Sequence, residues 1–433
     1  MCVYASLLHS MMWVYYQRLG SSIFILFFLF QSMFGEHAIE RYVSTCGEDI
    51  PGGGSFSSPY RSVGFAISDS MVDLTTFTDS HLMLSLSNGT YQAQNNSNLL
   101  VDSFSIQLVA TKVASSPVII DLAGADNFLT ARNGLSFKMS NIVVKNSALS
   151  ALHIANVSYV EIENCLFEEN GLSTAMMKSV QGGGVYVDSP SVSLTSVSFV
   201  KNSAYEGGGM YATCATNCGP FPTLTIVSNC TFISNSAIGD GGGAIYVRDI
   251  SFQCADTQFQ SNSAQNGRGG AILLSATSRM NGTPILGIMI GASGGKNRAG
   301  RDGGYLAVLD TDVTISNSVG EGTMMLWENE AGGEGGFLYL ENGAFVAENV
   351  SMSLRNNFAG VAGGAIALIN SPNSSLSGSI YFDNNTAACG ADILLRNASL
   401  SNPFSIFRNT LSSSTSLYVG YNSLYRTSPH TEN

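Results

Sequence analysis

The chain has 433 residues, of which 45% are hydrophobic and only 12% charged; its 19 basic and 31 acidic side chains give a net charge of −12 at pH 7. This composition is typical of a folded chain and excludes a largely disordered one. Because the balance is acidic and no basic run occurs, nucleic acid and anionic lipid are poor candidates as partners.

The N-terminal segment, residues 1–38, has the pattern of an export signal. An apolar run over residues 23–30 follows Arg18 and a short polar stretch, as in the charged and apolar regions of a signal peptide. Apolar residues also extend back to Met11, so an uncleaved signal anchor is the alternative, and the membrane would then be a partner only through that anchor. We expect cleavage between Gly35 and Ala38 and a secreted or cell-surface location.

One pattern returns about every 29 residues after residue 140: an apolar residue, two spacers, Asn, a spacer and Ala, followed by a Gly pair or triplet and an apolar run. The ten Asn positions that mark it are Asn146, Asn170, Asn202, Asn235, Asn262, Asn297, Asn329, Asn357, Asn385 and Asn409. A repeat of this length predicts a solenoid.

Within each repeat the apolar residues alternate, as Leu224 and Ile226 do, which indicates short strands. A propeller blade would need roughly 40–50 residues, so one coil of a parallel β-helix per repeat fits better, with about ten to twelve coils in all. We expect one elongated all-β domain, with an N-terminal cap and first coils over residues 39–140, repeats over 141–420 and a tail over 421–433.

The repeated Asn and Gly residues have separate expected roles. Asn side chains that stack on one another at an inward turn can bond the next coil and the turn backbone. The Gly pair suits a bend that requires positive φ or a close backbone approach. Both roles are structural, and we assign no chemistry to this Asn column.

The repeat resembles that of the chlamydial polymorphic outer membrane proteins and their eukaryotic relatives, as seen at Gly242–Ile245, Gly269–Ile272 and Gly363–Ile366. Residues 42–49, with Cys46 and Gly47, are similar to the opening of many pectin-lyase-like domains. The resemblance implies a single-stranded right-handed parallel β-helix on the cell surface, used for adhesion or recognition. Because residues 428–433 are unlike a strand of the chlamydial C-terminal barrel, we expect a eukaryotic secreted relative.

Cysteines and glycosylation sequons give weaker signals. Cys214 and Cys218 lie in a Pro-rich insertion over residues 214–222 and are a candidate local disulfide. Cys165 and Cys230 are two coils apart and are interpreted as apolar fillers. Candidate N-glycosylation sites are Asn88, Asn95, Asn156, Asn229, Asn349, Asn373 and Asn397. The abundance of Asn, Ser and Thr alone would produce nearly as many sequons.

No catalytic, cofactor-binding or metal-binding residue is predicted, because no paired His and carboxylate motif of the polysaccharide-cleaving β-helices is present. One candidate charged stripe precedes the Gly pairs of five successive coils: Glu206, Asp240, Arg268, Asp302 and Glu334. The stripe could bind Ca²⁺, recognise a sugar, or be a solvated turn, and the last interpretation is favoured. Glu206 and Asp240 are where a ligand is expected first.

Trp327 follows an apolar marker position, so its ring could face outward, although a lone Trp more often serves packing. We favour a non-catalytic secreted or cell-surface recognition or adhesion protein that presents a rigid surface to a carbohydrate or protein ligand. The alternative is a carbohydrate-active enzyme, a pectin-lyase-like polysaccharide lyase or hydrolase. A structural coat role without a defined ligand is a third interpretation.

Overall fold

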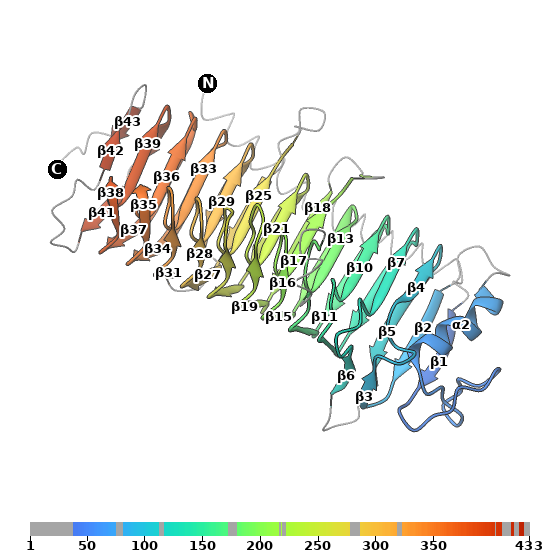
Figure 1. The fold of residues 1–433 in the computed structure, drawn as a ribbon. Helices are drawn as coiled ribbons and strands as arrows, with labels where there is room; N and C mark the ends of the chain where they lie inside the picture. Colours follow the sequence, from blue (N-terminus) through green and yellow to red (C-terminus); the bar gives the residue numbers. More distant parts are fainter. Residues whose placement is uncertain are drawn as a thin grey trace, which may run out of the picture.

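The computed structural model describes residues 38–74, 81–111, 117–171, 180–215, 218, 222–277, 286–317, 323–402, 404–408, 417–419 and 424–427. Its strands stack into an elongated solenoid, with the single described helix α2 (Val63–Leu74) at the N-terminal end, where it contacts the first strands (Figure 1). No helix among the described residues is both long and apolar enough to span a membrane.

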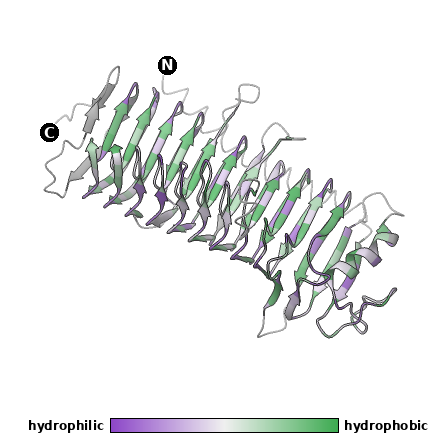
Figure 2. Ribbon diagram, in the orientation of Figure 1, coloured by the Kyte–Doolittle hydropathy of each residue, from purple (hydrophilic) through white to green (hydrophobic). Residues whose placement is uncertain are grey.

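Three parallel sheets form the walls of the solenoid. One has 12 strands, one from each coil: β4 (Leu99–Asp102), β7 (Leu129–Arg132), β10 (Leu152–Ala155), β13 (Val185–Asp188), β17 (Met210–Thr213), β21 (Ile245–Arg248), β25 (Ile272–Ser275), β29 (Leu306–Leu309), β33 (Leu338–Glu341), β36 (Ile366–Ile369), β39 (Ile393–Arg396) and β42 (Leu417–Val419). Most residues of these strands are hydrophobic (Figure 2), although several of the strands end on a charged residue, such as Asp102, Arg132 and Asp188.

The second wall is a 24-stranded sheet, in which most coils contribute two consecutive strands and the long strands β34 and β37 join the two rows. Its members are β1 (Ala38–Val43), β2 (His81–Leu86), β3 (Gly89–Gln92), β5 (Ser105–Ala110), β6 (Val118–Asp121), β8 (Ser136–Ser140), β9 (Ile142–Lys145), β11 (Tyr159–Glu163), β12 (Leu166–Glu168), β14 (Ser191–Thr195), β15 (Ser198–Val200), β18 (Thr223–Ser228), β19 (Thr231–Ile233), β22 (Ser251–Ala255), β23 (Gln258–Gln260), β26 (Leu286–Ile290), β27 (Ser293–Gly295), β30 (Asp312–Ser316), β31 (Met324–Trp327), β34 (Phe345–Arg355), β37 (Ser374–Asp383), β40 (Ser399–Asn402), β41 (Phe404–Arg408) and β43 (Leu424–Thr427).

The third wall is a seven-stranded sheet of short strands: β16 (Ser203–Ala204), β20 (Ser236–Ala237), β24 (Ser263–Ala264), β28 (Arg298–Ala299), β32 (Glu330–Ala331), β35 (Phe358–Ala362) and β38 (Thr386–Cys389). Together the sheets confirm the predicted all-β solenoid and its coil number. Parallel pairing already begins between β1 and β2, within the region expected to hold the cap and first coils.

Inside the walls, like residues stack on like because the register is constant from coil to coil. Phe167, Phe199, Phe232 and Phe259 form a buried column with ring centroids 5.1, 4.7 and 5.0 Å apart. Close packing of this kind makes the cost of a changed core volume high. The column stops at Gly294, and the buried ring of Tyr305, which directly precedes β29, packs against Phe259 there.

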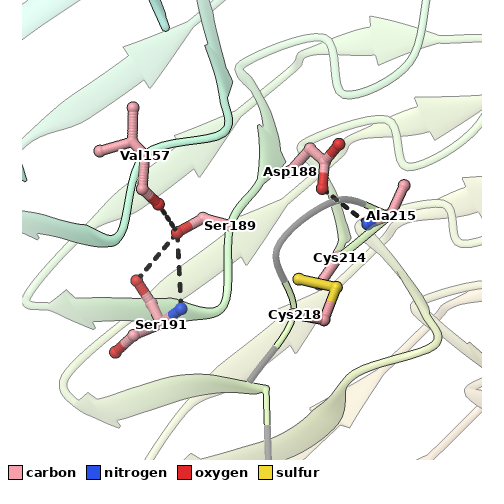
Figure 3. Close-up of a disulfide and its surroundings, with 7 residues drawn as sticks. All are labelled: Val157, Asp188, Ser189, Ser191, Cys214, Ala215 and Cys218. Atoms are coloured by element: carbon pink, nitrogen blue, oxygen red, sulfur yellow. Dashed lines mark hydrogen bonds between the residues drawn. A yellow bond between two sulfur atoms is a disulfide. The ribbon is translucent and has the colours of Figure 1, made fainter. Parts of the chain in front are cut away.

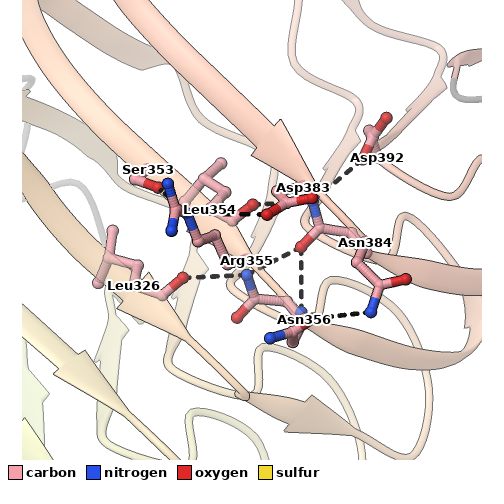
Figure 4. Close-up of polar contacts among 10 residues, drawn as sticks. Leu326, Ser353, Leu354, Arg355, Asn356, Asp383, Asn384 and Asp392 are labelled. Atoms are coloured by element: carbon pink, nitrogen blue, oxygen red, sulfur yellow. Dashed lines mark hydrogen bonds and ion pairs between the residues drawn. The ribbon is translucent and has the colours of Figure 1, made fainter. Parts of the chain in front are cut away.

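The repeated Asn residues form a continuous ladder from Asn170 to Asn385. Each side-chain amide donates to the side-chain oxygen of the Asn one coil onward at 3.0 Å, and that oxygen also accepts the preceding coil's Asn backbone N–H. The side chains are buried, so these bonds satisfy groups that water does not reach. At its C-terminal end the amide of Asn385 donates to Asp392, which is labelled in Figure 4.

Two of the predicted ladder positions need separate mention. The prediction for Asn146 is wrong, because β9 pairs with β12 so that Val144, not Val143, aligns with Phe167, and Ser147 therefore occupies the column. Asn146 instead has a φ of 62° and donates to Asp121. Asn409 lies outside the described residues.

The two expected roles of the Gly pair, a bend with positive φ and a close backbone approach, belong to different members of the pair. Gly269 has a φ of 66°, and a Cβ there would lie 2.1 Å from the carbonyl oxygen of Ile272. At Gly270 a Cβ would lie 2.1 Å from the carbonyl oxygen of Gly304 in the next coil. The first Gly thus permits the bend and the second permits coils to approach closely.

Replacing the central rung Asn235 with Ala should destabilise the protein by roughly 2–6 kcal/mol, because at least two buried polar groups, the Asn202 N–H and the Phe199 carbonyl, lose their partners. The exposed neighbour Ser234 is the matched control, and Ser234→Ala should change stability by less than about 0.5 kcal/mol. Urea unfolding followed by circular dichroism measures both. Equal midpoints for the two variants would contradict a stabilising ladder.

Gly269→Ala should destabilise the protein more than Gly124→Ala. Both glycines have positive φ, but no atom lies within 4 Å of a Cβ built at Gly124. Gly124→Ala should therefore cost only about 1–2 kcal/mol of left-handed backbone strain, while Gly269→Ala adds a backbone clash of roughly 1–3 kcal/mol. Thermal melting compares them, and a Gly124 variant that melts lower than the Gly269 variant would show that the close approach is not what matters.

Candidate functional site

Charged residues gather at the corner that leads into the 12-stranded sheet, next to the positive-φ glycines. Gly269 donates its N–H to the carbonyl of Asp302, and Gly303 donates to that of Glu334, at 2.9 Å each. The same bonds run from Gly207 to Gly241 and from Gly242 to Arg268. The residues that stack in this corner are therefore Glu206, Gly241, Arg268, Asp302 and Glu334, and we call the four charged ones the charged column.

The structure corrects the predicted stripe at one position. Gly241, not Asp240, pairs with Arg268, because the second glycine of the triplet, Gly242, has the left-handed φ of 66° that the first glycine has in most other coils. Asp240 is therefore one residue outside the column and is exposed. It still lies close enough for its charge to act on Glu206.

The members of the charged column are held by partners from neighbouring coils. Arg268 forms an ion pair with Asp302, 2.9 Å between Nε and Oδ2, with side chains only 22% and 15% exposed. Its guanidinium also lies 5.5 Å from the centre of the Tyr339 ring. Asp302 accepts the backbone N–H of Glu334, whose own carboxylate pairs with Arg396. These charges are thus fixed and largely compensated.

Metal binding finds little support within the described ranges. No group of three or more His, Cys, Asp or Glu side chains in them is placed to hold a metal ion. Because Ca²⁺ takes six to eight oxygen ligands, the described part of the charged column offers it no such ligand set.

Glu206 has a buried carboxyl group at this corner. Its side chain is buried, with 9% of the residue exposed, and accepts a hydrogen bond of 2.7 Å from Gln181. Burial raises the pKa of Glu206 above its ordinary value, and the charge of Asp240 raises it further, against the opposing effects of Gln181 and Arg248. A buried carboxyl with a raised pKa is a candidate proton donor.

A row of aromatic side chains runs beside Glu206 at the outward positions of the 12-stranded sheet. His153, Tyr186 and Tyr211 are stacked, with centroids 4.4 and 5.7 Å apart, and Tyr246 meets Tyr211 edge-on at 5.1 Å. A cavity of about 250 Å³ opens at this end, lined by His153, Tyr186 and Gln181 among others. Burial lowers the pKa of His153, which favours its neutral form.

Sequence reasoning missed this aromatic row, although a signal was present. Tyr186, Tyr211 and Tyr246 each stand second in the strand that follows a Gly triplet. The register β13–β17–β21 brings them together, and single repeats read in isolation did not reveal that their side chains share one column.

Cys214 and Cys218 are joined by a disulfide, with their Cα atoms 5.7 Å apart (Figure 3). Beside it, Asp188 accepts the backbone N–H of Ala215 at 2.8 Å, which ties the insertion to β13. Cys165 and Cys230 are buried, and Val197 lies between them in the stack. Burial raises the pKa of both thiols, to about 12 for Cys165, so they are poor nucleophiles.

The sequons coincide with a turn pattern of the fold. Asn156, Asn229, Asn349 and Asn397 all have positive φ, the next residue in each case is buried, and the Ser or Thr after it is not. A corner that consists of a left-handed Asn, an inward residue and an outward Ser or Thr has the sequence of a sequon, whether or not the Asn carries a glycan. Asn95, another positive-φ Asn, and Asn373 are exposed, and Asn88 is half-buried.

A family model described as the right-handed β-helix region matches residues 64–284, about half of the chain. The chain belongs to the right-handed β-helix family. No curated protein matches its sequence. For this β-helix protein the family therefore gives the fold and its hand, and the choice among functions depends on the geometry of the site.

Glu206→Gln should stabilise this β-helix protein at neutral pH. A raised pKa means that the folded state holds its proton more tightly, so the wild type loses stability as pH rises from the ordinary carboxyl value through the raised one. The extra stability of the variant relative to the wild type should be complete at pH values above the raised pKa and absent below about pH 4. Melting temperatures from pH 3.5 to 8 test this, with Glu348→Gln, at an exposed position of β34, as the control. A pH-independent difference would contradict it.

Proposed function

We propose that this β-helix protein is a non-catalytic recognition or adhesion protein, secreted or displayed at the cell surface. The observation that carries the proposal is the charged column, in which Arg268, Asp302 and Glu334 are each fixed by a partner from another coil. Groups held in this way form a rigid row of paired charges, with a spacing of about 4.8 Å set by the coils. Rigidity lowers the entropy cost of binding a carbohydrate or protein ligand.

The repeat adds support for this assignment. Its resemblance to the polymorphic outer membrane protein repeat favours adhesion, and we assign the chain to the eukaryotic secreted relatives of that group. The apolar segment within residues 1–38 is then the export signal or signal anchor, and the exposed sequon residues Asn95, Asn229, Asn349, Asn373 and Asn397 are the accessible glycan acceptors.

An enzyme acting on an acidic polysaccharide is the second candidate, because of Glu206. A carboxyl whose pKa is raised by burial, beside the exposed carboxylate of Asp240, is the kind of pair from which a general acid and its partner are built. The proposal and this alternative differ in whether a bound glycan is cleaved.

The test is a screen of the full chain, produced in eukaryotic cells, for binding to arrays of glycans and of extracellular proteins and for polyuronate turnover, with and without Ca²⁺. Binding without turnover is expected. Turnover that is lost in the Glu206→Gln, Asp240→Asn double variant and kept in Glu348→Gln would replace the proposal with the enzyme. Absence of binding to both glycans and extracellular proteins would overturn the proposed recognition function in favour of a structural coat role.

A further inference from the structure

The outer face of the 24-stranded sheet carries a lone indole at strand β31. Leu326 points into the core and is 1% exposed, whereas its neighbours Met325 and Trp327 point outward, with Met325 37% exposed. In the register, Trp327 aligns with Gly295 of the preceding coil and with Arg355 of the following one. Trp327 is therefore placed on the wall and contributes nothing to the core.

The preceding coil leaves a hollow beside this indole. Its strand β27 consists of Ser293, Gly294 and Gly295, so it projects almost no side chain outward. A Cβ built at Gly295 would lie 2.4 Å from Cε2 of Trp327, so the indole rests directly on the backbone there. Because β27 has almost no outward side chains, the indole from the next coil lies against its backbone, and a cavity of about 990 Å³ lies on this face.

This outer groove extends along the axis of the solenoid. Its lining runs from Asn229, before β19, through the coils of β23, β27 and β31 to Arg355 and Asn356 at β34. Five coils at a spacing of about 4.8 Å give a length of roughly 19 Å. Such a groove fits an extended chain better than a compact small molecule.

The groove is polar but nearly neutral. Besides Trp327 and Met325 it is lined by Gln258, Ser293 and Thr323, whose amide and hydroxyl groups both donate and accept hydrogen bonds.

Its two charged groups have opposite signs. The guanidinium of Arg355 donates to Ser353 at 2.8 Å, forms a 3.9 Å ion pair with Asp383 and lies 5.2 Å from the Tyr381 ring centre. Asp256 supplies the balancing negative charge.

We propose that the outer groove binds a neutral oligosaccharide chain along the solenoid axis, with Trp327 as the stacking platform. An aromatic face packs against the C–H face of a sugar ring, while neutral amides and hydroxyls bond its hydroxyl groups. This assignment rests on the proposed recognition function and names its ligand class and site.

A peptide fits the groove less well. An extended peptide gains most of its affinity by adding to a free sheet edge, but β23, β27 and β31 are each paired on both sides. At these three strands a ligand can therefore contact side chains on the outer face, but it finds no free strand edge to pair with.

The experiment titrates neutral oligosaccharides, such as linear hexoses of four to six units, into the full chain carrying Trp13→Phe, which leaves Trp327 as its single Trp. Binding should change the fluorescence of Trp327. Isothermal titration should show at least tenfold weaker binding for Trp327→Ala. Ser293→Phe, which fills the floor and keeps the indole, should weaken binding as much.

Tyr159→Ala is the matched control, since Tyr159 is an outward aromatic on β11 of the same sheet, 36% exposed and outside the groove. It should bind like the wild type. Melting curves confirm that every variant is folded.

Wild-type affinity that is unchanged by both Trp327→Ala and Ser293→Phe would overturn the groove while leaving the recognition function intact. A ligand set restricted to anionic glycans or to peptides would also overturn it. Absence of any ligand, in this titration and in the screen on glycans and proteins, would remove both proposals.

Discussion

Constant register between coils is the constraint on which the rest of this molecule depends. The buried Asn ladder enforces it on one corner, since each side chain must reach both the amide and the backbone N–H of its neighbours. A coil shifted by one residue would leave these buried groups without partners, at a cost of about 1–3 kcal/mol each. The Phe column, the aromatic row and the charged column all follow from this alignment.

Much of the fold could be predicted from the sequence because its cause is local. The spacing of Asn202, Asn235 and Asn262 and the Gly pairs that follow them directly reflect a turn that each coil must make. Errors arose where one coil departs from its neighbours by a single residue: Ser147 replaces the expected Asn146, and Gly241 replaces Asp240. Only the pairing register, which is a property of two coils, reveals such shifts.

The site was less accessible to sequence reasoning for the same reason. The ion pair between Arg268 and Asp302 joins residues 34 positions apart, and the contact of Trp327 with Gly295 depends on a missing side chain in another coil. Neither residue of these pairs is unusual in its own repeat. Functional surfaces of a solenoid are built across repeats, so they become visible once the coils are stacked.

The hydrogen bonds that join one side chain of the Asn ladder to the next all point the same way, so the dipoles of these side-chain amides are aligned along the solenoid. Every amide from Asn170 to Asn357 donates toward the C-terminus, a hydroxyl at Ser147 starts the series, and the carboxyl side chain of Asp392 receives its last donor. Aligned amide dipoles polarise one another and place partial positive charge at the donor end, where an anionic acceptor is stabilising. A coil added to this protein therefore belongs inside the ladder, because one added beyond Asp392 would separate the aligned dipoles from the group that terminates them.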